Sequence, residues 1–535
     1  MNEEIKNELE TYYKANVWEQ MTLGEALTLW SQKYGDAKAL TEDGESITYK
    51  TLESEANKLA QGFKQYGFSK GDVVVLQMPN SIAFVEVSFA LFKLGVIPVM
   101  ALPAQRKVEL KGIIEKTKAK GYIIKDQYLG FDYKMMAREI LGELELPLEV
   151  IVMGEADEFI ALETFKGEEE LREKVEVDYT SVGLYLLSGG TTGIPKLIPR
   201  RHTDYLYVAR ESGKKCGMNG ETVYLAALPM AHNFPLCCPG ILGTFTVGGR
   251  VVICNVTSPD EIIPLIEDEE VTVTALVPAV AGMCIEFLEE DDSYDLSSLE
   301  VVQVGGSVLE SYLAEKIEET FECTLQQVFG IAEGLICCTD LNASDEVRYT
   351  TQGSPISTYD EVLIVDEDEQ EVPVGEAGEL IVRGPYTIYG YYNLEEVNKV
   401  CISEKCYFKT GDKARKLENG NYQIMGRIKE TINRAGEKIT PSEIEELLLR
   451  HDDIESIQVI GVQDKLLGER ICAFILGDEE VLSLNDIRNY LIGKQVATFK
   501  LPDQVVYVSQ WPLTSVGKIN RNSLKALAQT TGEEA

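Results

Sequence analysis

Short, almost continuously apolar segments alternate with helical segments along much of the chain, and this alternation restricts the possible folds more than any other feature. The segments DVVVLQMP (72–79) and VIPVMALP (96–103) have the apolar runs of strands that are buried on both faces. Between them, SIAFVEVSFALFKLG (81–95) has the composition of a helix that stops at Gly95. Buried strands separated by helices predict a parallel α/β sheet that helices cover on both faces.

The same alternation continues on both sides of this region. An amphipathic helix is predicted in TYKTLESEANKLAQGF (48–63), where apolar residues recur at helical spacing: Leu52, Ala56, Leu59, Ala60 and Phe63. Between residues 222 and 330 four further strands are predicted, in TVYLAALP, GGRVVIC, VTVTALVP and LEVVQVGG. At 535 residues the chain is also too long for one compact core, so more than one domain is expected.

The pattern changes in the last third of the chain. In 360–384, two extended stretches flank an acidic turn, which indicates an antiparallel hairpin. After about residue 428 a small α+β unit is predicted, with helices at 441–450 and 484–493 and strands near 456–462 and 470–476. The sequence therefore predicts a domain boundary near residue 428.

Charge and composition exclude several classes of protein. The net charge of −38 repels nucleic acid and anionic membranes. No apolar run approaches the roughly 18–20 residues of a membrane-spanning helix, and the start, MNEEIKNELE, lacks the apolar core of a signal peptide. Eleven cysteines without a repeated spacing indicate reduced thiols. A cytoplasmic protein is expected.

A glycine-rich loop follows a predicted strand in LYLLSGGTTGIPKLIPRRH (184–202). Glycines let backbone N–H groups approach an anion, and the neighbouring hydroxyls add donors. A Walker P-loop is excluded, because Lys196 stands between a proline and a leucine rather than before a serine or threonine. Taken alone, the loop predicts either a phosphate site of another kind or a glycine-rich turn without a ligand.

The S-G-G-T-T-G-x-P-K sequence of this loop resembles the phosphate loop of the adenylate-forming superfamily, which includes acyl-CoA synthetases, luciferases and nonribosomal peptide adenylation domains. Further segments follow in the superfamily's order: VFGIAEG (328–334), GELIVRGPYTIYGYY (378–392), YFKTGDKAR (407–415), GRIKETINRAGEKITPSEIE (426–445) and PLTSVGKINR (512–521). On these motifs the chain is identified as a member over roughly residues 20–525.

The resemblance implies a fold. It consists of a large N-terminal domain (1–428) of parallel sheets covered by helices plus a small β-barrel-like subdomain, and a small mobile α+β C-terminal domain (429–535). Lys429 corresponds to the hinge. Rotation there would carry Lys518 away and bring the 434–438 loop to the site, where Gly436 would let a pantetheine arm pass close to the backbone.

The resemblance also implies a reaction that uses ATP and Mg²⁺. A carboxylate attacks the α-phosphate, which gives an acyl-adenylate and pyrophosphate, and a thiol then displaces AMP. Lys518 would bridge the carboxylate and the α-phosphate, Glu333 would hold Mg²⁺, and His232 is a further catalytic candidate. The nucleotide would contact Ser188, Gly189, Gly190, Thr191, Thr192, Gly193, Lys196, Gly305, Gly306, Ser307, Val328, Phe329, Gly330, Asp412 and Arg427.

The segment MAHNFPLCCPG (230–240) allows three interpretations: a metal site, a nucleophile or the lining of a pocket. Adjacent cysteines project poorly toward one metal, and the second doublet, Cys337–Cys338, has the same fault. A cysteine nucleophile is not needed for adenylate formation. Within the superfamily the segment resembles the stand-alone aryl-acid adenylating enzymes of siderophore assembly, which implies a pocket for an aromatic acid. Its expected lining is His232, Asn233, Phe234, Cys238, Gly305, Ala332, Ile336 and Cys337.

The identity of the acid is the least constrained prediction. In the resembling subgroup, Cys at position 238 and a large aliphatic residue at position 336 tend to accompany salicylate, whereas Ser and Val tend to accompany 2,3-dihydroxybenzoate. A neutral Asn233 suits an acid without an α-ammonium group. Salicylate is the favoured substrate, with 2,3-dihydroxybenzoate or another aryl acid as alternatives.

The expected thiol partner is a separate phosphopantetheinylated aryl carrier protein of a nonribosomal peptide synthetase. Coenzyme A is the alternative, which would make the chain an aryl-CoA synthetase. The segment VGGSV (304–308) imitates a phosphopantetheine attachment motif but lacks its intervening residue, so Ser307 is not expected to carry that group. A non-catalytic binding protein on this fold is disfavoured because Lys518, Glu333 and Asp412 are all present. The expected assembly is a monomer or a homodimer.

Overall fold

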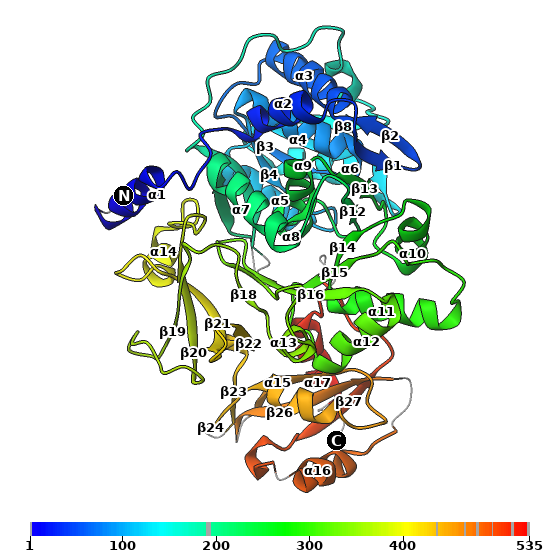
Figure 1. Ribbon diagram of the computed structural model, residues 1–535, viewed down its shortest axis with the longest axis vertical. Helices are drawn as coiled ribbons and strands as arrows, with labels where there is room; N and C mark the ends of the chain where they lie inside the picture. The colour runs from blue at the N-terminus through cyan, green and yellow to red at the C-terminus, as the bar shows by residue number, and fades with distance from the viewer. Residues whose placement is uncertain are drawn as a thin grey trace.

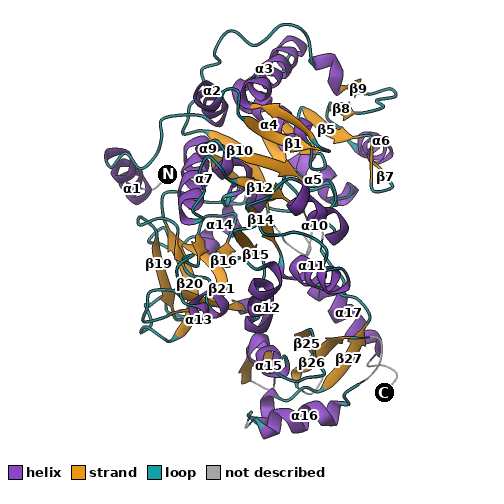
Figure 2. Cartoon of the chain, turned by 45° about the vertical axis from the view of Figure 1, so that its right-hand side comes forward, coloured by secondary structure: helices purple, strands orange, loops and turns teal. Residues whose placement is uncertain are grey.

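The computed structural model describes residues 3–188, 194–434, 437–464, 467–477, 481–494, 496–514 and 518–531 (Figure 1). The predictions for Gly189–Gly193 and for Gly436 lie outside the described residues. The described chain forms three parts (Figures 1 and 2). An upper body contains two large sheets, a small sheet adjoins this body, and the C-terminal residues form a lower unit.

One large sheet has seven strands in the order β11-β10-β4-β3-β5-β8-β9. Their bounds are β3 (Val73–Gln77), β4 (Ile97–Met100), β5 (Gly121–Lys125), β8 (Glu149–Met153), β9 (Ile160–Ala161), β10 (Val182–Leu187) and β11 (Leu197–Arg201). The pairs are parallel except for β10 with β11, which are antiparallel on either side of the glycine-rich loop. This edge pair brings the two ends of the predicted phosphate loop together.

The other large sheet has nine strands in the order β18-β17-β16-β15-β14-β12-β13-β1-β2. Their bounds are β1 (Lys38–Glu42), β2 (Glu45–Thr48), β12 (Val223–Ala226), β13 (Arg250–Ile253), β14 (Val273–Leu276), β15 (Val301–Gly305), β16 (Thr324–Gly330), β17 (Ile336–Cys338) and β18 (Ser354–Pro355). The central pairs are parallel, as predicted. Antiparallel pairs, which were not predicted from the sequence, complete both edges.

Helices pack around these sheets and join their strands. They are α1 (Glu3–Lys14), α2 (Leu23–Tyr34), α3 (Tyr49–Tyr66), α4 (Ile82–Leu94), α5 (Lys107–Thr117), α6 (Tyr133–Glu143), α7 (His202–Lys215), α8 (Asn233–Cys237), α9 (Gly240–Val247), α10 (Pro259–Asp268), α11 (Pro278–Glu290), α12 (Ser311–Phe321), α13 (Asp345–Thr350) and α14 (Glu395–Cys401). In α4 the Ser81 side chain accepts from the Phe84 N–H at the start, and Gly95 ends the helix with φ 68°. The predicted apolar face of α3 is buried.

A smaller antiparallel sheet has the order β19-β20-β21-β22, with bounds β19 (Glu361–Val365), β20 (Ala377–Arg383), β21 (Phe408–Lys416) and β22 (Tyr422–Arg427). The predicted hairpin is β19–β20. Within the described ranges β19 and β22 are the two edges of the path and are not paired with each other. The predicted barrel-like subdomain is thus corrected to an open sheet.

The C-terminal residues form a second unit with cores of its own. Its strands are β23 (Ile432–Arg434), β24 (Glu437–Ile439), β25 (Ile457–Asp464), β26 (Gly468–Leu476) and β27 (Gln504–Val508), and its helices are α15 (Pro441–Leu448), α16 (Leu484–Gly493) and α17 (Arg521–Thr531). Among the described residues, this unit has two apolar clusters that contain no buried side chain of the upper body. The α+β pattern is confirmed. The domain boundary at residue 428 and the mobility of the C-terminal domain stay predictions.

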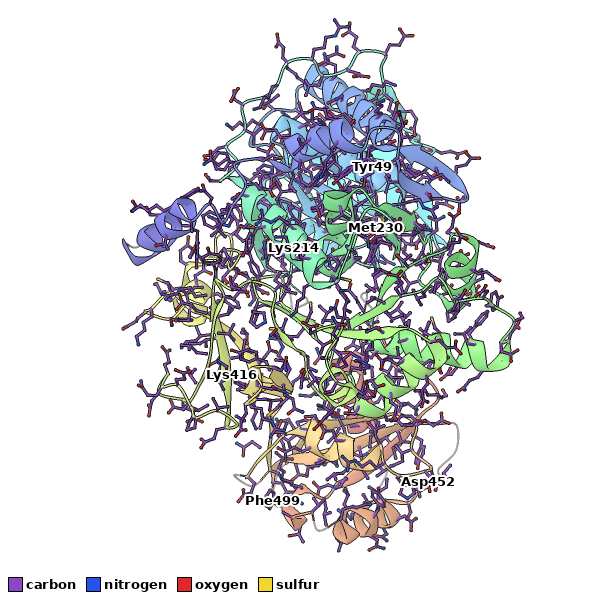
Figure 3. All side chains as sticks on the ribbon, viewed as in Figure 1. Tyr49, Lys214, Met230, Lys416, Asp452 and Phe499 are labelled. Carbon is purple, nitrogen blue, oxygen red and sulfur yellow. The ribbon has the colours of Figure 1, made fainter. Side chains whose placement is uncertain are left out.

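Side chains fill the space between these elements, as Figure 3 shows for the surroundings of Met230 in the upper body and of Phe499 in the lower unit. None of the helices in the described ranges combines the length and the apolar character that crossing a bilayer requires.

Candidate active site

The carboxyl ends of β15 and β16 form a narrow backbone slot. Gly305 pairs with Val328 across these parallel strands. A Cβ atom on Gly305 would lie 2.4 Å from the Val328 carbonyl oxygen and 3.3 Å from Cε1 of Phe234, so only glycine fits there. Gly306 has φ 93° and, like Ser307 and Gly330, is exposed to solvent. The structure therefore brings together the two predicted nucleotide-contacting segments, 305–307 and 328–330, at an open edge.

Lys518 lies over this slot, although it belongs to the C-terminal unit. Its Cε atom is 3.4 Å from where a Cβ of Gly306 would stand. The turn that carries it is closed by two hydrogen bonds: the Thr514 N–H donates to the Lys518 carbonyl at 2.6 Å, and the Lys518 N–H donates to Thr514 Oγ1 at 3.2 Å. The Lys518 side chain thus reaches the upper body from the C-terminal unit.

The charges around Lys518 are those that the sequence predicted to act together. Burial lowers the pKa of Lys518, the nearby Arg427 lowers it further, and Asp412 and Glu333 oppose this shift. A lysine, an arginine and two carboxylates from β16–β17, β21, β22 and the C-terminal unit therefore share one site. Such a group can bind and neutralise a phosphate while positioning a second anion.

Asp412 combines burial with an unused acceptor. It is 4% exposed on β21 and pairs with Arg427 on β22, whose Nε lies 2.9 Å from Oδ1. Oδ2 is buried and has no hydrogen-bond partner among the described residues. Burial raises the pKa of Asp412 to about 6 against the opposing effect of Arg427, and Glu333 raises it further. An orphaned carboxylate oxygen of this kind fits a ribose hydroxyl.

Glu333 lies in a tight turn between β16 and β17 that is held from outside. Its carbonyl accepts from the Ile388 N–H at 2.8 Å, and its Oε1 accepts from the Tyr391 hydroxyl at 2.7 Å. A Cβ on Gly334 would lie 2.7 Å from Cα of Thr387, so the turn is pressed against the 385–391 segment. A carboxylate that is held in place at the edge of a phosphate site is a suitable ligand for Mg²⁺, which prefers oxygen ligands.

The stem of the glycine-rich loop leads to the same place. The Lys196 N–H donates to Ser188 Oγ at 3.0 Å, and the Ser188 N–H donates to the Lys196 carbonyl at 3.0 Å. Lys196 Nζ lies 4.4 Å from the centroid of the Tyr391 ring, which carries the hydroxyl bound to Glu333. The loop therefore opens beside the predicted metal ligand.

His232 begins α8 and is electrically neutral. Its Nδ1 accepts from the Phe234 N–H at 3.3 Å, so the ring proton resides on Nε2. Burial, and then the charge of Lys518, lower the pKa of His232 to about 3. A neutral imidazole this close to Lys518 can donate a hydrogen bond to an oxygen anion, and it does not act as a cation.

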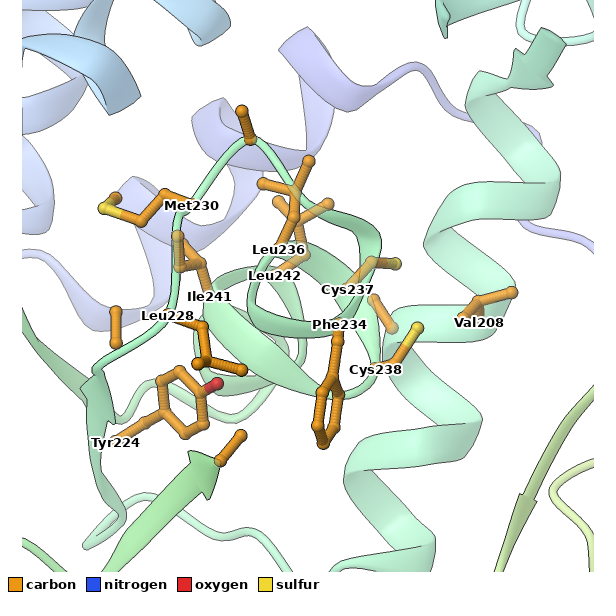
Figure 4. Packing of buried hydrophobic residues seen from close by; sticks show 14 of the residues in the cluster. Val208, Tyr224, Leu228, Met230, Phe234, Leu236, Cys237, Cys238, Ile241 and Leu242 are labelled. Carbon is orange, nitrogen blue, oxygen red and sulfur yellow. The ribbon is translucent and has the colours of Figure 1, made fainter. Parts of the chain in front are cut away.

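The rest of α8 forms a mostly apolar wall that Figure 4 shows at close range, with Phe234 and Cys238 next to each other. Asn233 is its polar member: Oδ1 accepts from the Tyr205 hydroxyl at 2.9 Å, and Nδ2 donates to Cys238 Sγ at 3.2 Å. Since Cε1 of Phe234 contacts the Gly305 position, this wall stands directly over the slot.

Strand β17 separates two members of the predicted pocket, Ile336 and Cys337. Ile336 pairs with Gly330 and Cys338 with Val328, whereas Cys337 pairs with Phe329. Side chains alternate along a strand, so Ile336 and Cys338 share the face of Val328, and Cys337 lies on the opposite face. Ile336 and Cys337 therefore do not face the same side of β17, and which of the two lines the pocket stays a prediction.

Two buried residues of the site were not predicted from the sequence. Arg200, 1% exposed, donates from Nη1 to the Ala332 carbonyl at 2.6 Å and from Nε to Asp204 at 3.3 Å. The hydrogen bond from Arg200 to the Ala332 carbonyl holds the turn of Glu333 from the side of the phosphate loop. Tyr205 supports Asn233. The only sequence signal was their position shortly after the glycine-rich loop, where a lone arginine or tyrosine is typical of a surface or a core.

Comparisons with known proteins decide the family. The model of the AMP-binding enzyme family matches residues 27–392, and that of the AMP-binding enzyme C-terminal domain matches residues 443–518. The chain belongs to the AMP-binding enzyme family. It is an ATP-dependent, adenylate-forming enzyme, as the motifs predicted.

Among the relatives of this AMP-binding enzyme, a 2,3-dihydroxybenzoate-AMP ligase of Bacillus subtilis is 43% identical over 516 residues, which are 96% of this chain and 95% of the relative. A salicyl-AMP ligase / salicyl-S-ArCP synthetase of Mycobacterium tuberculosis is 38% identical over 529 residues, which are 98% and 94%. The apo structure of Mycobacterium smegmatis MbtA superposes with a TM-score of 0.75 at 35% identity and covers 97% of both chains.

Proposed function

We propose that this AMP-binding enzyme activates an aromatic carboxylic acid with ATP and passes the aryl group to the phosphopantetheine thiol of a separate aryl carrier protein. The observation that carries the proposal is the position of Lys518, which lies among Glu333, Asp412 and Arg427 and next to the wall of α8. The names of the two relatives support an aryl acid as the substrate.

In the first half-reaction an oxygen of the acid attacks the α-phosphorus of ATP, and pyrophosphate leaves. Lys518 would neutralise both anions at this point, and His232 would donate from Nε2 to the acid or the phosphate. Asp412 would accept from the ribose hydroxyls through Oδ2, with Arg427 beside it. The 305–307 and 328–330 segments would enclose the adenine.

Glu333 is the proposed ligand of Mg²⁺, which when bound supplies positive charge to the phosphates. The Tyr391 hydroxyl and the Ile388 N–H fix the position of this carboxylate. The phosphate loop that begins at Ser188 and ends at Lys196 would hold the β- and γ-phosphates, with Gly189, Gly190, Thr191, Thr192 and Gly193 as its donors.

The second half-reaction requires Lys518 to leave. Lys429 is exposed in the short 3₁₀ segment Ile428–Glu430, between the last strand of the open sheet and the first strand of the C-terminal unit. We propose that rotation at this segment removes the lysine and brings Gly436 to the site. The thiol then attacks the carbonyl carbon of the aryl-adenylate, and AMP leaves.

Salicylate is the proposed acid. The pocket would be lined by His232, Asn233, Phe234, Cys238, Gly305, Ala332 and either Ile336 or Cys337, which lie on opposite faces of β17. A thiol at Cys238 is a weak partner for a ring 3-hydroxyl, and Ile336 narrows the space beside it. The second candidate is 2,3-dihydroxybenzoate, which the Bacillus subtilis relative favours by its name. Coenzyme A is the alternative thiol.

The test is ATP–pyrophosphate exchange across benzoate, salicylate, 2,3-dihydroxybenzoate, aliphatic acids and amino acids. Salicylate is expected to give the highest kcat/KM. Loading of a purified holo aryl carrier protein is then compared with transfer to coenzyme A. Exchange with aliphatic acids or amino acids but with no aromatic acid would overturn the proposal.

A further inference from the structure

Tyr205 contacts the proposed pocket from behind, through Asn233. It lies on α7 and is completely buried, and its hydroxyl is 2.9 Å from Asn233 Oδ1. On its other side Asn233 donates from Nδ2 to Cys238 Sγ at 3.2 Å. The amide is therefore held at both ends, by a phenol and by a thiol.

The phenol decides which end of the amide faces which neighbour. Burial holds the pKa of Tyr205 well above its ordinary value, so the hydroxyl keeps its proton. Among the described residues, Asn233 Oδ1 is the acceptor that this proton reaches. If the amide were turned by 180°, the phenol would face an NH₂ group and its own buried O–H would lose its acceptor, which is costly.

The tyrosine is itself fixed in place. Its carbonyl accepts from the Cys237 thiol at 3.2 Å, which ties α7 to α8. The Arg200 guanidinium carbon lies 5.3 Å from the centroid of its ring, and Asp204 holds that guanidinium. The hydroxyl therefore cannot follow a rotating amide.

Asn233 is consequently a donor toward the pocket. Its oxygen already accepts from Tyr205 and one amide hydrogen goes to Cys238, so the second N–H is the donor that remains. Lys518 and His232 mark the carboxylate end of the acid, whereas the amide of Asn233 is turned toward α7 and Cys238. The second amide hydrogen is thus the donor that Asn233 has left for the ring side of a bound acid.

We propose that Tyr205 is a positioning residue that makes Asn233 a donor, and that the pair selects aromatic acids with an oxygen, rather than an amine, at the ortho position. This inference rests on the proposed function. In salicylate the ortho hydroxyl donates to its own carboxylate and its oxygen can accept from Asn233. In 2-aminobenzoate the ortho nitrogen presents N–H groups and a poor acceptor, so two donors would face each other.

The test compares Tyr205→Phe with wild type by ATP–pyrophosphate exchange on salicylate, 2-aminobenzoate and benzoate. The variant lets the amide turn. We expect the preference for salicylate over 2-aminobenzoate to fall about tenfold, mainly through KM for salicylate, with kcat changing less than about twofold. The KM for benzoate, which has no ortho group, is expected to stay near the wild-type value.

Tyr207→Phe is the matched control. Tyr207 lies on the same helix, is 5% exposed, and its hydroxyl is 2.7 Å from Ser357 Oγ. The control loses an equivalent buried hydrogen bond without touching Asn233, so its preference ratio is expected to equal that of wild type. A ratio that moves equally in both variants would assign the effect to general loosening and overturn the inference.

Two outcomes separate this inference from the function on which it rests. If wild type exchanges with no aromatic acid, both fail. If wild type uses salicylate but a folded Tyr205→Phe keeps its ratio, only the inference fails. Should Tyr205→Phe not fold, Asn233→Asp replaces the donor by an acceptor, which the Tyr205 hydroxyl can stabilise. It is expected to prefer 2-aminobenzoate, and an unchanged ratio would refute the donor assignment.

Discussion

Asp412 is expected to strengthen AMP binding and, when it is ionised, to lower the stability of the fold. The Asp412→Asn variant tests both effects. The carboxyl is buried, and its pKa is raised from 3.8 to about 6 because burial outweighs the nearby Arg427. A carboxyl with a raised pKa in the folded state favours its neutral form. Its contribution to stability is therefore complete below about pH 4 and is lost as the pH rises through about 6.

The magnitude follows from the shift. One pKa unit is worth about 1.4 kcal/mol, so a shift of roughly two units corresponds to about 3 kcal/mol in the free energy of unfolding. Only the part of this free-energy change that occurs between pH 5 and pH 6 can be measured conveniently. Wild type is expected to lose about 1.4 kcal/mol relative to Asp412→Asn between pH 5 and pH 8. AMP affinity of the variant should fall ten- to a hundredfold, on the order of one charge-assisted hydrogen bond.

The assay is the difference in melting temperature between variant and wild type at pH 5, 6, 7 and 8 without nucleotide, followed by AMP titration calorimetry at pH 7. Asp292→Asn is the control, since Asp292 is exposed on the loop after α11. The variant should gain stability over wild type as the pH rises from 5, and the gain should level off above about pH 6. A difference that is constant from pH 5 to 8, or unchanged AMP affinity, would refute the reasoning.

Three further predictions concern catalysis. Lys518→Ala should lower pyrophosphate exchange at least about a hundredfold, since a lost charge contact in a dry site costs ~3 kcal/mol or more, while thioester formation from preformed aryl-adenylate survives; exchange above about a tenth of wild type contradicts the role. Lys429→Pro should leave adenylation intact and abolish acyl transfer, because proline fixes φ near −65°; an equal loss of both half-reactions argues against a hinge there. Cys238→Ser should shift kcat/KM toward 2,3-dihydroxybenzoate by roughly three- to tenfold, since one hydrogen bond is worth ~0.5–1.5 kcal/mol, and more with Ile336→Val; an unmoved ratio means that Cys238 does not face the ring.

Elements whose signal is local could be predicted from the sequence. The apolar runs of β3, β4 and β12–β15 exceed what a half-buried strand carries, and Gly95 marks the end of α4 where a left-handed residue is needed. The order of the strands within each sheet could not be predicted from the sequence. Nothing in the sequence of β1 indicates that it joins β13, more than 200 residues further along the chain.

The same distinction between local and long-range signals applies to the residues of the site. Asp412, Glu333 and Lys518 stand in motifs, so the amino-acid sequence alone was enough to propose them as site residues. Cys337 could not be placed, because its face depends on the register of β17 against β16, where one position reverses the side chain. Tyr205 could not be recognised either, because its role depends on a contact with Asn233, 28 positions away.

The buried thiols of the α8 wall bear on how a reactive intermediate survives. An aryl-adenylate is a mixed anhydride, and a thiolate beside it would capture the aryl group and leave the protein acylated on itself. Burial raises the pKa of both Cys237 and Cys238, and the same holds for Cys338 on the neighbouring strand. These sulfurs stay protonated and are poor nucleophiles. Cysteines in the wall would therefore not compete with the proposed thiol acceptor for the aryl-adenylate.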